Sequence, residues 1–257
     1  MKNILLKLYY FGNLKSEISE QNQEKIRQIE WDAVKGYIVN GSKFLDVGCG
    51  SGYSMRKASN ELNCICSGID PDPGAFGVGR YSNQSTIGLN IKKGSAEKID
   101  FKDESFDIVY CSHVLEHVNN ENGSLIEMKR VLKKDGVLII GMPTSSMAWV
   151  NFYTDLLFTT HHRIFNILFK YVPYIKTGKT PLINMLIPSS HSSHRAKTIF
   201  FDLKHYKVNN WKSILSKVFQ IENTLLPAFY PYPQYRQLFK MKKLYKKSSS
   251  VFFICKK

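Results

Sequence analysis

The amino-acid sequence predicts an α/β fold in which a parallel sheet carries helices on both faces. A short buried strand, residues 43–47, runs directly into the glycine-rich loop GCGSG. Strands then alternate with helices at a period of roughly 25–40 residues, which is typical of a parallel sheet. With 43% hydrophobic and 22% charged residues, the composition excludes a disordered, collagen-like or coiled-coil protein.

The elements before residue 94 follow from caps, apolar stripes and turn residues. Ser16 or Ser19 can cap a helix, and a rough apolar stripe continues it to residue 39. Glycine and serine then separate this helix from the strand at 43–47. After the glycine-rich loop we expect a helix (53–61), a strand (64–70), the turn PDPGAFG (71–77) and a weak strand (87–93).

Apolar runs predict the remaining elements of the sheet. The run FDIVYCS predicts a strand at 106–112, SLIEMKRVLK a helix at 124–133, and GVLIIGMP a strand at 136–143 that a proline terminates. Near the end of the chain we expect two further strands, at 217–223 and 249–257.

Residues 143–200 do not fit the alternation and are predicted to form a helical insertion after the fifth strand. Aromatic and aliphatic residues recur there at helical spacing from Trp149 to Phe169, with Arg and Lys between them. This stripe fits either a helix that covers the core or an amphipathic helix at a membrane surface. We therefore expect an N-terminal helical segment (1–40) and one domain (41–257) that contains this basic, aromatic-rich insertion.

The positive charge is concentrated in the carboxyl-terminal part of the chain. The 36 Lys and Arg exceed the 21 Asp and Glu, which gives a net charge of +15. Residues 1–142 contain 18 residues of each sign, whereas residues 143–257 contain 18 basic and 3 acidic residues and so hold the entire excess. An anionic partner is therefore expected in the second part.

The cysteines and apolar segments favour a cytoplasmic protein. The five cysteines include no C-x-x-C pair, which argues for reduced thiols and against disulfides or zinc. The amino terminus lacks the small-residue cleavage site of a signal peptide, and no apolar run reaches about 18 residues. The basic insertion favours a peripheral position on the inner face of the membrane.

The glycine-rich loop is the clearest indication of a binding site. Gly48, Gly50 and Gly52 let the chain turn sharply, so a ligand can approach the backbone at the carboxyl end of a strand. Asp70 ends the next strand about 20 residues further on, where a carboxylate can accept hydrogen bonds from both hydroxyls of a ribose. The alternative for Asp70 is a turn residue before Pro71.

These motifs resemble the class I S-adenosylmethionine-dependent methyltransferases, in particular the type 11-like group that acts on small molecules, quinones and glycans. FLDVGCGSG resembles the first motif of that family and GIDPD its second-strand motif. GSAEKIDFKDESFDIVYCSHVLEHV and RVLKKDGVLIIGMP resemble its third-to-fifth-strand regions. The resemblance implies S-adenosyl-L-methionine as cofactor and a Rossmann-like, doubly wound, seven-stranded sheet with an antiparallel last strand.

The resemblance also implies which residues hold the cofactor. They are Asp46, Gly48, Cys49, Gly50, Gly52, Asp70, Ala96, Glu97, Cys111 and Ser112. Among them, Asp70 would take the ribose, while Ala96 and Glu97 would lie beside the adenine. One departure is Ser95, because the family usually has an aspartate there that contacts the adenine amino group.

Two groups of histidines are candidates for the chemistry. His113 and His117 follow the fourth strand, where the resemblance places the transferred methyl group, and His117 is the first candidate for a general base. A capping or packing histidine is the alternative for His117. His191, His194 and Arg195 are candidate substrate-binding residues, with solvated surface residues as the alternative. No third ligand stands near them, so no metal is expected.

The sequence as a whole predicts an S-adenosylmethionine-dependent methyltransferase. The insertion favours transfer to an oxygen of a small-molecule, lipid-linked or glycan acceptor at or near an anionic membrane surface. One alternative is a nucleic-acid methyltransferase, because basic residues with interleaved aromatics can bind phosphates and stack bases. Against it, the fourth strand ends in CSHV and not in the Pro-Pro-aromatic motif of enzymes that methylate exocyclic amines of bases. The other alternative is a non-catalytic binding module.

Overall fold

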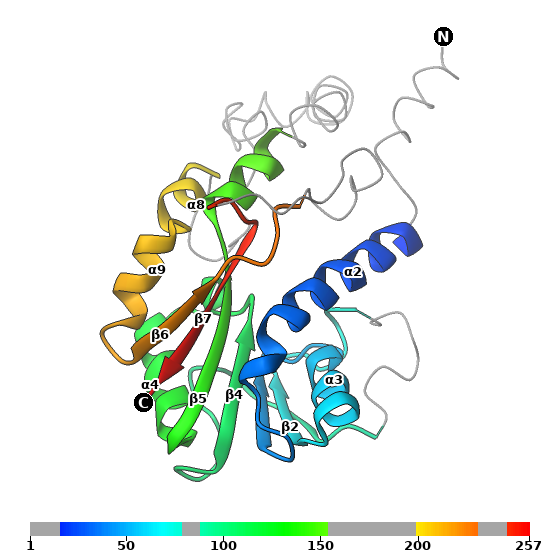
Figure 1. Ribbon diagram of the computed structural model, residues 1–257, viewed down its shortest axis with the longest axis vertical. Helices are drawn as coiled ribbons and strands as arrows, with labels where there is room; N and C mark the ends of the chain where they lie inside the picture. The colour runs from blue at the N-terminus through cyan, green and yellow to red at the C-terminus, as the bar shows by residue number, and fades with distance from the viewer. Residues whose placement is uncertain (1–15, 79–87, 154–198, 231–245) are drawn as a thin grey trace, which may run out of the picture.

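The described residues of the computed structural model, 16–78, 88–153, 199–230 and 246–257, form a seven-stranded sheet between layers of helices (Figure 1). The strands are β1 (Lys43–Val47), β2 (Ile65–Asp70), β3 (Ile91–Lys93), β4 (Phe106–Ser112), β5 (Leu132–Pro143), β6 (Gln220–Leu225) and β7 (Ser250–Lys256). The helices are α2 (Ser16–Val34), α3 (Tyr53–Leu62), α4 (Glu121–Val131), α8 (Ile199–His205) and α9 (Val208–Leu215), with 3₁₀ turns η1 (Lys35–Tyr37) and η2 (Leu115–His117).

The strand order, β3-β2-β1-β4-β5-β7-β6, is that of a doubly wound sheet. β1 pairs in parallel with β2 and with β4, while β7 runs antiparallel between β5 and β6. Val47 lies opposite both Ile69 and Cys111, so the carboxyl ends of three strands meet at one edge. From β1 the chain continues to β2 on one side of β1, and it later returns to β4 on the other side. Such a reversal of strand order leaves a crevice at the carboxyl edge of the sheet. The predicted fold class, including the antiparallel last strand, is confirmed.

Two apolar cores hold the layers together, one on each face of the sheet. Figure 1 shows α2 and α3 on one side of the strands and α4 and α9 on the other. On the first side, Trp31 and Val34 of α2 pack with Phe44 of the sheet. On the second side, Met128 of α4 and Trp211 of α9 pack against the opposite faces of the same strands.

Several element boundaries differ from the sequence-based expectation for identifiable reasons. The expected helix at 124–133 begins earlier, as α4, because the side chain of Asn120 accepts a hydrogen bond from the Gly123 backbone N–H at 2.9 Å and caps it. The weak third strand shortens to β3, which pairs with β2 at the edge of the sheet that the described residues form. Helices α8 and α9 were not predicted from the sequence. α9 is short, and its fully buried side chains are Trp211 and Leu215, one helical turn apart.

The first part of the predicted insertion is a helix that follows β5. Residues 145–153 are helical, with Met147 and Ala148 buried in the core beneath α9. Trp149 and Tyr153 face outward, with exposed fractions of 47% and 54%. The rest of the predicted stripe, to Phe169, lies outside the described residues. Among the helices described, none is long and apolar enough to cross a bilayer.

Candidate active site

The loop after β1 and the end of β2 form one hydrogen-bonded unit. Gly48 and Gly50 adopt positive φ values of 75° and 51°, which other residues rarely adopt. The turn directs the Gly50 N–H to Oδ2 of Asp70 at 2.8 Å, and Asp72 donates its N–H to Oδ1 at 2.8 Å. The Asp70 carboxylate is therefore fixed on both oxygens at the carboxyl edge of the sheet.

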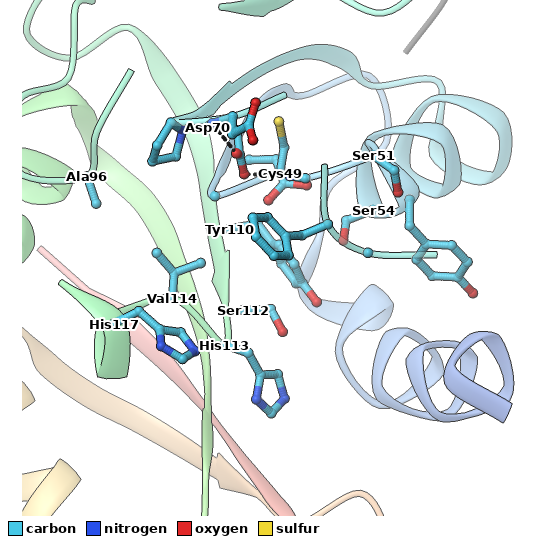
Figure 2. Close-up of a pocket in the computed structure, with 18 of the residues that line it drawn as sticks. Cys49, Ser51, Ser54, Asp70, Ala96, Tyr110, Ser112, His113, Val114 and His117 are labelled. Carbon is cyan, nitrogen blue, oxygen red and sulfur yellow. Dashed lines mark hydrogen bonds between the residues drawn. The ribbon is translucent and has the colours of Figure 1, made fainter. Parts of the chain in front are cut away.

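A cavity of about 670 Å³ opens beside this unit (Figure 2). Except for Gly52 and Cys111, every predicted cofactor-binding residue lines it, and so do both predicted catalytic histidines. In the view of Figure 2, Asp70 and Cys49 lie at one end of the cavity, and His113 and His117 lie toward the other. Its volume is in the range of clefts that enclose one drug-sized ligand.

The two predicted residues that do not line the cavity belong to a turn and to the apolar core. Gly52 precedes α3 with φ 78°, and a Cβ there would lie 2.3 Å from Cδ1 of Leu89. Cys111 is fully buried in the core on the α4 side, and burial raises the pKa of its thiol well above the ordinary value. Because side chains alternate along a strand, Tyr110 and Ser112 point to the cavity side instead.

The adenine side of the predicted site is built from the segment after β3. Ala96 is buried, and Ser95 lines the cavity and accepts a hydrogen bond from the Glu97 N–H at 3.2 Å. The Glu97 carboxylate accepts the backbone N–H groups of Asn119 and Asn120 at 2.7 and 3.1 Å. Glu97 thus connects this segment to the start of α4, at the wall of the cavity.

Asp46, at the other side of the loop, is a buried carboxyl group with an exposed fraction of 3%. Its burial and the negative charge of Asp70 raise its pKa to about 8. A positively charged ligand group at this position would remove the repulsion between the two acids and stabilise both as carboxylates.

Beyond β4, the two predicted histidines belong to a row of ion pairs that runs from the buried side of the cavity to its wall. His113 has φ 57° and donates its backbone N–H to the Gly141 carbonyl at 2.8 Å. Its Nε2 lies 3.3 Å from Oε1 of Glu30, and its Nδ1 lies 3.6 Å from Oε1 of Glu116. Nε2 of His117 lies 3.9 Å from the same Glu116 oxygen. His113 is therefore clamped between two acids, whereas His117 is 38% exposed on the cavity wall.

Helix α2 supplies the buried end of this row of ion pairs. Arg27 pairs with Oε2 of Glu30 at 2.6 Å, and the Tyr230 hydroxyl donates to Oε1 of Glu30 at 3.0 Å. Burial alone would raise the pKa of Glu30, but Arg27 and His113 hold it well below its usual range.

The two acids in turn determine the charge of His113. Burial and Arg27 act to lower the pKa of His113. Glu30 and Glu116 outweigh both, so the net direction is upward. His113 is consequently held in the imidazolium form more strongly than a free histidine.

Sequence reasoning did not find the contribution of α2 to this site. Arg27 and Trp31 line the cavity from that helix, and Tyr53 lines it from α3. Among the unpredicted lining residues, Tyr110 could have been found from the sequence. The two-residue period of FDIVYCS places it on the same face of the strand as Ser112, which was predicted to line the site. The predicted substrate residues His191, His194 and Arg195 lie outside the described residues. Within the described ranges, no group of three or more His, Cys, Asp or Glu side chains is arranged to hold a metal ion.

The sequence family described as a methyltransferase domain matches residues 45–140, which run from β1 to β5. The glycine loop, Asp70 and both histidines all fall inside this match. The chain carries a class I S-adenosylmethionine-dependent methyltransferase domain. Its cofactor is S-adenosyl-L-methionine.

Curated relatives of this methyltransferase domain include enzymes named ubiquinone biosynthesis O-methyltransferase. The one from Glaesserella parasuis is 37% identical over 107 residues, which cover 39% of this chain and 44% of that protein. The one from Azorhizobium caulinodans is 26% identical over 116 residues, which cover 45% and 46%. The chain thus spans about half the length of the curated relatives that it matches.

Solved methyltransferase structures share the fold over nearly the whole chain. A methyltransferase of Thermotoga maritima, described as a possible histamine N-methyltransferase, has a TM-score of 0.54 and 19% identity over 92% of this chain and 91% of that one. A putative S-adenosylmethionine-dependent methyltransferase of Listeria monocytogenes has a TM-score of 0.54 and 17% identity over 90% and 97%. At these identities the likeness establishes the fold alone.

The chemistry of the cavity fits the cofactor of the methyltransferase domain. Asp70 offers fixed carboxylate oxygens for hydroxyl donors, and Asp46 offers a buried acid for a positively charged amino group. Val114 and Val118 add apolar surface to the wall. An acid suits the positively charged amino group of the cofactor, and a carboxylate that accepts hydrogen bonds suits the ribose hydroxyls. Apolar side chains suit the adenine.

Proposed function

We propose that this protein transfers a methyl group from S-adenosyl-L-methionine to an oxygen atom of a small acceptor. The observation that supports this best is that one cavity contains both the Asp70 unit and the imidazole of His117. The names of the relatives from Glaesserella parasuis and Azorhizobium caulinodans, both O-methyltransferases, favour oxygen as the acceptor atom.

In this proposal the cofactor lies along the carboxyl edge of the sheet. Asp70 binds the ribose hydroxyls, because its two oxygens each keep acceptor capacity beyond the backbone N–H that they already bind. Asp46 and the backbone of the Gly48–Gly50 loop bind the methionine end. Ala96 and Glu97 flank the adenine, and Ser95 offers a hydroxyl where the family usually has an aspartate.

The protein's own contribution to the reaction is alignment and removal of a proton. When bound, the cofactor supplies a methyl group that its sulfonium already activates. Holding an acceptor oxygen in line behind that methyl group can account for about 7–11 kcal/mol of rate acceleration. His117, on the cavity wall, takes the proton of the acceptor hydroxyl, which adds a further factor of about 10²–10⁴.

The acceptor that we propose is a small-molecule, lipid-linked or glycan molecule at or near an anionic membrane surface. The net charge of +15 is held by residues 143–257. Large apolar side chains of that region are exposed, namely Trp149 and Tyr153 near its start and Phe200 in α8, with exposed fractions of 47%, 54% and 58%. Aromatic residues beside basic ones favour the boundary between lipid headgroups and acyl chains.

The proposed reaction is tested with methyl-labelled S-adenosylmethionine, the purified protein and a lysate of cells that lack it. The products are separated into lipid, polysaccharide, protein, nucleic-acid and small soluble fractions. Alkali-stable label in an ether linkage, in the lipid, polysaccharide or small-molecule fraction, is expected. Label in nucleic acid, or on nitrogen, would contradict the proposal.

The membrane surface is tested separately by co-sedimentation with phosphatidylglycerol-containing and with purely phosphatidylcholine vesicles. We expect binding to the anionic vesicles alone, weakened by salt and by Trp149→Ser. Ile126 of α4 is 51% exposed, and Ile126→Ser provides the matched control on another face. Equal sedimentation of both variants would exclude Trp149 as a membrane contact, and absence of binding by the wild type would exclude the surface itself.

A further inference from the structure

Glu116 is a buried acid that fold stability alone does not explain. Its exposed fraction is 1%, and neither carboxylate oxygen has a hydrogen-bond partner in the part of the chain that the structure describes. The imidazoles of His113 and His117, at 3.6 and 3.9 Å from Oε1, lie at ion-pair distance but beyond hydrogen-bond distance. A carboxylate that is buried without hydrogen bonds destabilises a fold, whereas an apolar side chain of similar size would not.

The backbone around Glu116 is held in a strained conformation. His113 occupies the left-handed region at φ 57°, and such strain persists only where the surrounding structure enforces it. Enforcement comes from the backbone bond to Gly141 and from Glu30 and Glu116 on either side of the ring. A strained histidine between two acids, on a cavity wall, is typical of a functional site.

Besides Glu116, the titratable groups beside the two imidazoles and their acid partners come from helix α2, the segment after β6 and strand β4. Helix α2 contributes Glu30 and its partner Arg27, and the segment after β6 contributes the hydroxyl of Tyr230. On strand β4, the hydroxyl of Tyr110 is coupled to Glu30 and the thiol of Cys111 to Glu116, and burial raises the pKa of both groups, so both stay protonated. Glu116 is consequently the negative charge that both imidazoles share.

We propose that Glu116 is a positioning residue for methyl transfer, which holds the imidazoles of His113 and His117 in place on the cavity wall. The inference rests on the proposed function, in which the acceptor hydroxyl gives its proton to His117 while its oxygen receives the methyl group. Glu116 does not touch the acceptor. It orients the imidazole of His117 from behind, in the way that a third group orients a base in other enzymes.

The charge of Glu116 is tested by Glu116→Gln, which keeps the size of the side chain. The matched control is Glu121→Gln, because Glu121 pairs with His205 at 3.0 Å and does not line the cavity. For Glu116→Gln we expect kcat about tenfold lower, below the full effect of a base, with cofactor affinity within twofold of the wild type. The loss should fall on kcat and not on cofactor binding, because Glu116 acts on the position of the His117 imidazole.

Glu116→Asp, which restores the charge, should recover part of kcat. An unchanged kcat in Glu116→Gln, or the same loss in Glu121→Gln, would overturn the positioning role. Activity that requires an added divalent cation and disappears with a chelator would also overturn it, because Glu116 would then serve as a ligand.

A second measurement does not depend on activity. In protein labelled with ¹⁵N-histidine, the ring nitrogens of His113 should titrate at higher pH than those of free histidine, and this shift should shrink in Glu116→Gln. Absence of the change would overturn the proposal even in an active enzyme. If the change occurs but no fraction of the lysate accepts the methyl label, the proposed function has failed while the electrostatic part of this inference stands.

Discussion

The backbone N–H of Gly50 donates a hydrogen bond of 2.8 Å to Oδ2 of Asp70 and so joins the loop after β1 to the end of β2. The donor and the acceptor are 20 residues apart in sequence. Asp72 donates to the other oxygen at 2.8 Å, so the carboxylate cannot rotate away from the cavity. A fixed acid loses little conformational freedom when it binds a ligand, which favours affinity.

Replacement of Asp70 by Asn should weaken cofactor binding about 10- to 100-fold. The amide loses the negative charge and one acceptor oxygen, and a hydrogen bond to a charged group contributes about 1.5–3 kcal/mol. Isothermal titration calorimetry with S-adenosylmethionine measures the change. Asp100→Asn is the control, because Asp100 is exposed and does not line the cavity. Equal affinities in the two variants would remove Asp70 from the cofactor site.

Gly50→Ala should destabilise the loop by about 1–3 kcal/mol, because a Cβ at φ 51° is strained. That Cβ would also lie 2.6 Å from the backbone oxygen of Phe76, which cannot move aside as a side chain could. Gly36→Ala is the control, since its Cβ would meet nothing within 4 Å. Thermal unfolding and cofactor titration should show a loss for the first variant alone. A fully stable Gly50→Ala protein that binds cofactor normally would contradict the role of the turn.

The fold, and the meeting of the glycine-rich loop with Asp70, could be predicted from sequence because their signals are local. Gly48, Gly50 and Asp70 belong to two short motifs, and the parallel pairing of β1 with β2 brings them together without further information. Two predicted residues do not line the cavity. Gly52 forms the turn before α3, and the two-residue period of β4 turns Cys111 into the opposite core.

The ion pairs and hydrogen bonds around His113 could not be predicted, because the residues that form them are far apart in sequence. Glu30 meets His113 across 83 residues and Tyr230 across 200, and neither contact has a local pattern. Arg27 and Glu30 resemble ordinary charged residues of a surface helix. Only the packing of α2 against the sheet shows that Glu30 is buried, with an exposed fraction of 1%.

Asp46 should make the stability of the protein fall as pH rises between about 4 and 8. Its pKa in the folded state is about 8, against 3.8 for the unperturbed group, so the unfolded state releases the proton first. Asp46→Asn cannot ionise, so its free energy of unfolding should vary less across this range. Urea unfolding at pH 5 and pH 8 measures the difference.

The control for Asp46 is Asp107→Asn, which removes a carboxyl group whose pKa is shifted in the opposite direction. Burial acts to raise the pKa of Asp107, but the bond from Lys133 and other favourable contacts hold it below its ordinary value. Its contribution therefore changes below pH 4, and the slope between pH 5 and pH 8 should remain that of the wild type. A slope in Asp46→Asn that equals the wild-type slope would mean that Asp46 is charged in the folded protein.

His117→Ala should lower turnover about 10²- to 10⁴-fold, which is the effect of losing a general base. Cofactor affinity should stay within twofold, because His117 lies toward the opposite end of the cavity from Asp70 in Figure 2. The label-transfer assay measures turnover, and added imidazole should restore part of it by supplying the missing base. His205→Ala is the control, since His205 pairs with Glu121 away from the cavity. Because a packing histidine would lower stability without a response to imidazole, a variant that is unstable and not rescued would remove His117 as the base.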